Sequence, residues 1–122
     1  MTDVLYKIAS AIATEEGYWT LNSLPSRNHN PGDLRAAPYL PASEAPIVKG
    51  FVQFKTPASG IAGLYHQIAL DVARGITLRK LIAKWAPPTE NNTSAYLEHT
   101  VRRTGLNPDI PIQDYLEIEK LP

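Results

Sequence analysis

The sequence predicts an α+β fold in which helices predominate and a small β-hairpin belongs to an irregular lobe. Apolar residues recur at helical spacing near the start of the chain and again after residue 56. The region between these segments carries five prolines, which exclude a continuous helix there. A length of 122 residues suits one domain, and we expect a single domain over residues 1–122.

The first helix is expected to begin near Thr2 or Asp3, because either side chain can cap exposed backbone N–H groups. Gly17 is a natural end for this helix. Its apolar face is predicted from helical spacing and consists of Val4, Leu5, Ile8 and Ile12.

The segment from Tyr18 to about Lys55 is predicted to be a long loop with a small hairpin. Residues 30–33, Asn-Pro-Gly-Asp, are a strong turn signal. Short extended pieces are expected at residues 34–35 and 51–54, where β-forming residues cluster. A connection of this length in a compact domain is usually functional or disordered, and its aromatic and apolar residues argue against disorder.

Helices are expected to return after residue 56, each with a recognisable start and stop. The expected segments run from Thr56–Pro57 to Gly75, from Thr77 to Pro87–Pro88, from Asn92 or Thr93 to about Arg103, with Gly105 as the stop, and over a short stretch after Pro111.

Composition argues against several classes of function. Twelve basic residues offset twelve acidic ones, so the chain lacks the positive charge typical of proteins that bind nucleic acid. Without cysteine there is no disulfide or thiolate site, and the three histidines form no metal-binding pattern, so we expect neither metal nor cofactor. We see no signal peptide and no apolar run of about 20 residues, and therefore expect no stable membrane insertion.

Two carboxylates, Glu15 and Glu16, stand at the predicted end of the first helix, followed by Gly17, Tyr18 and Trp19. A carboxyl group that is partly desolvated at such a boundary can stay protonated and act as a general acid. Helical geometry alone does not choose between the two, and either can equally be a solvated surface residue. Trp19 and Trp85 are expected in the core or in a cleft wall.

Four segments, taken in order, resemble phage-type lysozymes and related lytic transglycosylases of phages and prophages. They are Ala13–Gly17, the run Asn28-His29-Asn30-Pro31-Gly32-Asp33-Leu34-Arg35, residues 51–54 followed by 56–64, and residues 85–93 leading into Tyr96. The resemblance implies a lysozyme-like fold and implies that Glu16, directly before the glycine, is the catalytic acid. It implies peptidoglycan glycan strands as the partner and no cofactor.

The chemistry of glycan cleavage leaves the bond-breaking route open. Hydrolysis uses a second carboxylate, as a base or as a nucleophile. A lytic transglycosylase, as the resemblance implies, works with one glutamate and forms a 1,6-anhydro sugar. This chain has His29 and Asp33 where the common form of the motif has asparagines. Asp33 is either a second carboxylate or a turn residue, and the turn is favoured.

Further residues have expected supporting roles in binding the glycan. Asn30 and Arg35 are expected to shape the site and Gln53 to line the glycan cleft, with hydrogen bonds to sugar groups. Tyr65 can offer a phenol to sugar rings, or pack in the core. The remaining candidates, for which a turn and helix cap is the alternative, are Glu90 and Asn91.

The predicted function is therefore peptidoglycan cleavage by a monomer that resides in a phage virion or in the host cytoplasm and acts at the bacterial cell wall. A first alternative is a non-catalytic glycan-binding or virion structural module on the same fold. A second is a small helical interaction protein or inhibitor, suggested by the eleven prolines.

Overall fold

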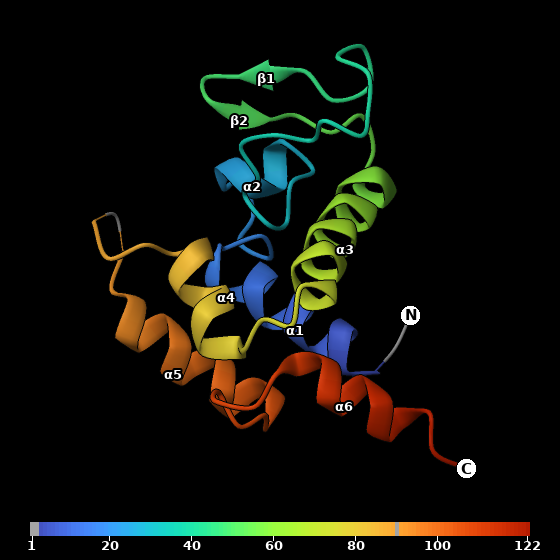
Figure 1. Ribbon diagram of the computed structural model, residues 1–122. Helices are drawn as coiled ribbons and strands as arrows, with labels where there is room; N and C mark the ends of the chain where they lie inside the picture. The colour runs from blue at the N-terminus through green and yellow to red at the C-terminus, as the bar shows by residue number, and fades with distance from the viewer. Residues whose placement is uncertain (1–2, 90) are drawn as a thin grey trace. The chain divides into compact units, whose positions relative to one another are not determined.

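The computed structural model describes residues 3–89 and 91–122 and is mostly helical with one small sheet, as predicted (Figure 1). The described elements are α1 (Asp3–Glu15), α2 (Leu24–Arg27), β1 (Ile47–Val48), β2 (Phe51–Val52), α3 (Pro57–Ala73), α4 (Leu78–Trp85), α5 (Thr93–Thr104) and α6 (Ile112–Glu119).

The predicted starts and stops of the longer helices are confirmed. The Thr77 side chain caps α4 by accepting from the Lys80 N–H, and the Asn92 side chain caps α5 by accepting from the Ala95 N–H. Gly105 ends α5 in the left-handed conformation, with φ of 72°. Such conformations cost glycine little, because it has no Cβ to clash with its own backbone.

One helix, α2, lies where only a loop and a hairpin were predicted. It begins after Ser23, whose hydroxyl accepts a hydrogen bond from the Ser26 N–H. Pro25 sits in the first turn, where its missing N–H costs nothing. The prolines that exclude a long helix therefore permit this single turn.

The hairpin is confirmed, but only one of the two expected extended pieces contributes a strand to it. β2 pairs antiparallel with β1, with Ile47 opposite Val52. The two residues between the strands, Lys49 and Gly50, both have positive φ, which suits a two-residue hairpin turn. Residues 34–35 form no strand, although the Leu34 carbonyl accepts a hydrogen bond from the Val52 N–H at 2.9 Å.

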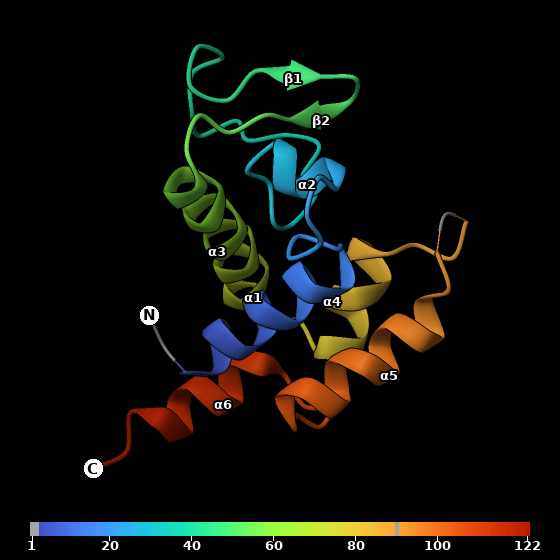
Figure 2. The ribbon, with the colours of Figure 1, turned by 180° about the vertical axis from the view of Figure 1, so that it is seen from behind.

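Two compact units make up the chain. The first, called the helical unit, comprises residues 1–11 and 68–122, and the second, the hairpin unit, comprises residues 12–67. In the helical unit, buried apolar side chains come from α1, α3, α4, α5 and α6. The hairpin unit has a buried apolar cluster that includes Val52 of β2; its members are Ala37, Ala45, Val52 and Phe54. Figure 2 shows β1 and β2 side by side, with α2 next to them.

Two glycines let α3 approach the rest of the hairpin unit closely. A Cβ added at Gly60 would lie 1.6 Å from the His29 carbonyl oxygen. A Cβ added at Gly63 would lie 2.5 Å from the Tyr39 hydroxyl and 2.7 Å from the Phe54 ring. One face of α3 thus packs its bare backbone against the turn and the buried apolar cluster.

The helical unit holds a buried acid. Asp71 on α3 is 2% exposed and pairs with Lys84 on α4 at 2.5 Å. Arg74 lies 3.8 Å from the same carboxylate oxygen. Burial of a carboxylate is tolerated where a cation and hydrogen bonds compensate it, so this pair connects α3 to α4 within the unit.

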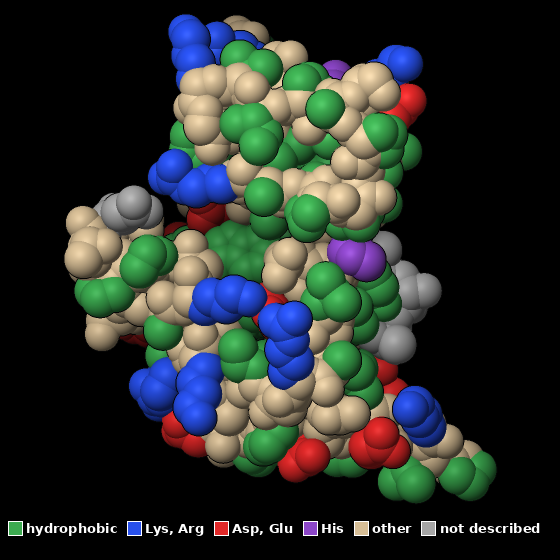
Figure 3. All heavy atoms as spheres, turned by 45° about the horizontal axis from the view of Figure 1, so that its top comes forward, with side chains coloured by type: hydrophobic (Ala, Val, Ile, Leu, Met, Phe, Trp, Pro, Cys, Tyr) green, Lys and Arg blue, Asp and Glu red, His purple; other side chains and the backbone are tan. Residues whose placement is uncertain are grey.

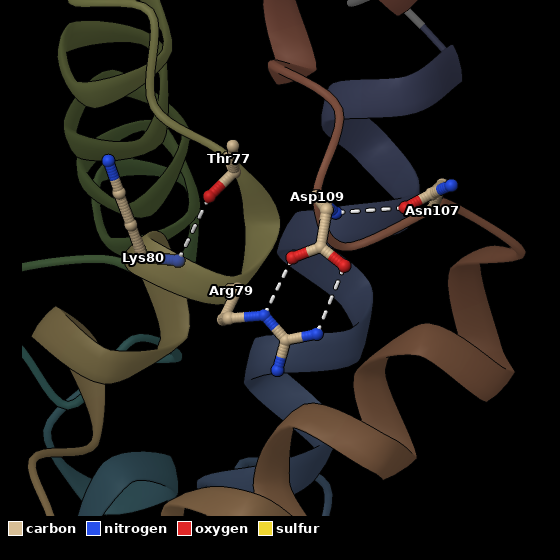
Figure 4. Close-up of polar contacts among 5 residues, drawn as sticks. All are labelled: Thr77, Arg79, Lys80, Asn107 and Asp109. Atoms are coloured by element: carbon tan, nitrogen blue, oxygen red, sulfur yellow. Dashed lines mark hydrogen bonds and ion pairs between the residues drawn. The ribbon is translucent and has the colours of Figure 1, made fainter.

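An exposed ion pair joins α4 to the loop before α6 (Figure 4). The Arg79 guanidinium donates to both carboxylate oxygens of Asp109, at 2.7 and 3.1 Å. The Asp109 N–H in turn donates to the Asn107 side chain at 2.9 Å. The hydrogen bond from Arg79 lowers the pKa of the Asp109 carboxyl below its ordinary value of 3.8.

Asp109→Asn is expected to lower the stability at pH 7 slightly and to have less effect in acid. Because the folded-state pKa is depressed, the contribution of the ionised carboxylate is present above pH 3.8 and is lost as the pH falls through the folded value. Both side chains are exposed, which keeps the effect small. Urea unfolding of the parent protein and of Asp109→Asn at pH 7 and pH 3 measures their difference in unfolding free energy. The same difference at both pH values would contradict this account.

The described residues place both acidic and basic side chains on the surface, as the neutral composition leads one to expect. On the face shown in Figure 3, acidic and basic side chains lie interspersed among apolar and polar ones. None of the helices in the described part of the chain combines the length and the apolar character needed to cross a membrane.

Candidate functional site

Glu16 follows α1 directly, at a point where the backbone is held in place. Its N–H donates to the Ile12 carbonyl at 2.9 Å, and Gly17 then turns the chain with φ of 78°. The Ser23 hydroxyl donates to the Gly17 carbonyl at 2.7 Å. Glu15 and Glu16 are both half-buried.

Trp19 is not a core residue, since its side chain is 65% exposed. Its ring meets that of Tyr18 edge-on, with centroids 4.9 Å apart. Three residues after Glu16, the hairpin unit therefore presents a broad aromatic surface to solvent. Such surfaces combine an apolar face with a polar N–H and are suited to flat or partly apolar ligands.

Asn30 is fully buried, and its amide is used inside the hairpin unit. Its Nδ2 donates to the carbonyls of Leu34 and Val52, each at 2.9 Å, and its Oδ1 accepts from the Leu34 N–H at 2.8 Å. Both amide hydrogens are thus engaged, which speaks against direct donation to a sugar. Asn30 instead connects the turn to β2 within the hairpin unit.

Asp33 completes the predicted turn and carries an unusual carboxylate. Its N–H donates to the Asn30 carbonyl at 3.0 Å, and its φ is 50°. Its Oδ1 is buried, and among the described residues no donor reaches it. Burial raises the pKa of the Asp33 carboxyl above 3.8, while the positive charge of Arg35 acts in the opposite direction.

Asp33→Asn is expected to raise the free energy of unfolding at pH 7 by about 1 kcal/mol. Because the pKa of Asp33 is raised in the folded state, the fold favours the protonated carboxyl. The stability that the protonated form contributes is lost as the pH rises through the folded-state pKa. Asparagine removes the buried charge and accepts positive φ well. Urea unfolding at pH 7 and pH 3.5 tests this, with a smaller gain at the lower pH. A loss of stability at pH 7 would mean that the carboxylate is compensated.

Arg35 and Gln53 are both exposed in the hairpin unit. The Arg35 guanidinium lies over the Phe51 ring, 4.6 Å from its centroid, a cation–π contact that orients it. The Gln53 amide lies 3.4 Å from the Asn28 side-chain oxygen. Both side chains therefore retain access to solvent from fixed positions.

The other predicted binding residues are divided between the units. Tyr65 is half-buried on α3 and belongs to the hairpin unit. Asn91 is exposed in the helical unit, where its N–H donates to the Pro87 carbonyl at 3.1 Å. Glu90 lies outside the described residues. Within the described ranges, no cluster of three or more His, Cys, Asp and Glu is arranged to hold a metal ion.

The hairpin unit also contains an open pocket of about 340 Å³ that the sequence did not predict. We call it the basic pocket, and its lining residues are Arg27, His29, Ser43, Glu44, Pro46, Gln53, Phe54 and Lys55. The lining residue Phe54 donates its N–H to the carbonyl of the buried Asn28 at 2.9 Å.

Comparison with known proteins gives a phage relative. The chain is 32% identical over 87 residues to Protein P5 of Pseudoalteromonas phage PM2. The aligned region covers 66% of this chain and 54% of Protein P5. The chain thus spans about half the length of the curated relative it matches. No protein-family model and no solved structure matches the chain. Similarity to a phage protein is the relationship that these comparisons establish.

Proposed function

We propose that this protein cleaves the glycan strands of peptidoglycan, with Glu16 as the acid that protonates the leaving oxygen, on a lysozyme-like fold. The observation that carries the proposal is that contacts connect three of the segments with a resemblance to lytic enzymes. These segments are residues 13–17, residues 28–35, and residues 51–54 with 56–64. The Ser23 hydroxyl ties Gly17 to α2, the Phe54 N–H binds the Asn28 carbonyl, and Gly60 packs on His29. Segments separated in sequence thus form one structural unit with Glu16.

The surroundings of Glu16 suit a glycan. The half-buried carboxyl follows a rigid helix, and rigid elements hold catalytic groups more accurately than free loops do. The exposed ring of Trp19 offers a surface on which the C–H face of a sugar can stack. Arg35 and Gln53 supply donors for acetamido and hydroxyl oxygens.

The reaction begins when Glu16 donates its proton to the glycosidic oxygen, so that the bond to the anomeric carbon breaks and an oxocarbenium-like centre develops. In the transglycosylase route, the resulting Glu16 carboxylate takes the proton of the sugar's 6-hydroxyl, whose oxygen closes the anhydro ring. In the hydrolytic route, water attacks the anomeric carbon, either directly or after a second carboxylate has formed a covalent intermediate there, and a carboxylate takes the proton of the water. The two routes yield products that differ by one water.

Asp33 is the candidate for the second carboxylate of a hydrolytic route, because it places a carboxylate where the resembling motif has asparagine, in the same unit as Glu16. If it activates water or acts as the nucleophile, Asp33→Asn is expected to lower the cleavage rate by about 100-fold or more. If the enzyme is a transglycosylase, the same variant is expected to keep its rate. Measured beside the unfolding experiment above, the rate separates a catalytic carboxylate from a turn residue.

Mass spectrometry of purified peptidoglycan treated with the protein tests the proposal. Fragments that end in an anhydro sugar are expected from transglycosylation, and fragments with ordinary reducing ends from hydrolysis. Glu16→Gln serves as the inactive control. Intact glycan after treatment with well-folded protein would overturn the proposal.

A second candidate is a phage virion module that binds glycan without cleaving it. It is favoured by the similarity to a protein of phage PM2. This function is expected to give glycan binding, by sedimentation with insoluble peptidoglycan, that Glu16→Gln leaves unchanged and that is accompanied by no new fragments.

A further inference from the structure

The basic pocket is built from three separate stretches of the hairpin unit. Arg27 and His29 come from the end of α2, Ser43 and Glu44 from the loop before β1, and Lys55 from the residues after β2. Its position is fixed from behind, since the His29 carbonyl packs on Gly60 and the His29 N–H donates to the Ser26 carbonyl. A pocket of about 340 Å³ matches the lower end of the range for small-ligand sites.

Its charge differs from that of the neutral chain. Two basic side chains, Arg27 and Lys55, line the pocket together with one carboxylate, Glu44. Within the described residues, neither Arg27 nor Lys55 forms an ion pair with a carboxylate. The pocket therefore has cationic groups available for an anionic ligand.

The remaining lining favours a peptide over a bare ion. The buried Phe54 and the half-buried Pro46 provide apolar walls, and the exposed Gln53 amide and Ser43 hydroxyl can bond to peptide groups. One negative charge in the lining, from Glu44, also disfavours densely charged ligands such as polyphosphates. Cations, apolar walls and amide-type partners together fit a short peptide that carries carboxylates.

We propose that the basic pocket binds the acidic peptide branch of peptidoglycan, through its carboxylates on Arg27 and Lys55. This inference rests on the proposed function, because that peptide is attached to alternate sugars of the glycan strand. Both the pocket and Glu16 belong to residues 12–67, so the same unit supplies the proposed acid and the proposed peptide site. The pocket would thereby select glycan that still carries its peptides.

Binding of one soluble repeating unit, a disaccharide with its peptide, tests the inference by calorimetry beside the same disaccharide without peptide. Arg27→Gln and Lys55→Gln are each expected to weaken binding of the peptide-bearing form about 3- to 10-fold, and binding is expected to weaken with added salt. Lys80→Gln is the matched control, because it removes one exposed positive charge from α4 in the helical unit and should change nothing. Thermal melts verify that each variant is folded.

The outcomes separate this inference from the proposed function. Equal affinity for the two disaccharide forms, or unchanged affinity in both pocket variants, overturns the peptide site even where glycan is cleaved. Peptide-dependent binding that needs Arg27 and Lys55, without any cleavage, supports the site and overturns the proposed reaction. Inorganic phosphate that competes as well as the free peptide does would show a general anion site and would overturn the assignment to a peptide.

Discussion

Glu16→Gln is expected to lower the rate of glycan cleavage by about 1000-fold, within the range that a general acid supplies. Glutamine keeps the size and hydrogen-bonding ability of the side chain but has no proton to donate to the leaving oxygen. The loss corresponds to about 4 kcal/mol of transition-state stabilisation. The rate is followed by the release of soluble fragments from insoluble peptidoglycan.

Glu15→Gln is the matched control, since it makes the same chemical change one residue earlier, at the end of α1. Both glutamates are half-buried, so loss of a surface charge alone would affect the two variants alike. We expect Glu15→Gln to retain a rate within a few-fold of the parent protein. Similar losses in both variants would remove the assignment of Glu16 as the acid, as would full activity of Glu16→Gln.

Gly60→Ala is expected to lower the free energy of unfolding by about 3 kcal/mol. On an ordinary helical surface the same change stabilises a protein by up to about 1 kcal/mol, because alanine has the higher helix propensity. At Gly60 the new methyl group would lie 1.6 Å from the His29 carbonyl oxygen and 2.8 Å from its carbon. Those atoms are backbone, so either α3 or the turn at residues 29–31 must move.

Gly63→Ala provides the comparison for this prediction. Its new methyl group would meet the Tyr39 hydroxyl and the Phe54 ring, which are side-chain atoms that can shift more easily than backbone. We therefore expect Gly63→Ala to cost less than Gly60→Ala, by about 1–2 kcal/mol of unfolding free energy. Urea unfolding followed by circular dichroism measures both. A Gly60→Ala protein as stable as the parent would show that the close approach of α3 to the turn is not required.

The sequence alone determined the long helices and the turn, because the signals for these features are local. Side-chain caps such as Thr77 and Asn92, and a glycine stop such as Gly105, act on backbone groups within four residues. The Asn30–Asp33 turn is likewise closed by one short-range hydrogen bond. The end of α1 beside Glu16 was predictable for the same reason.

Strand pairing and the shape of the lobe were decided by the tertiary structure. Residues 34–35 and 47–48 are both acceptable partners for β2 by composition, and the positive-φ pair Lys49–Gly50 favours the nearer one. The short helix α2 was not predicted from the sequence, because the five prolines of that region disfavour a helix, although one of them fits its first turn.

The roles of individual site residues also depended on packing between distant segments. The burial of Asn30 requires β2 to supply the Val52 carbonyl, 22 residues further along the chain. Packing between segments also decides three other features. These are the buried Asp33 Oδ1 that no described donor reaches, the exposure of Trp19 and the basic pocket. Sequence spacing determines which backbone groups can pair locally. Only the folded chain determines which side chains lose water, and desolvation is what sets their charge, their partners and their chemistry.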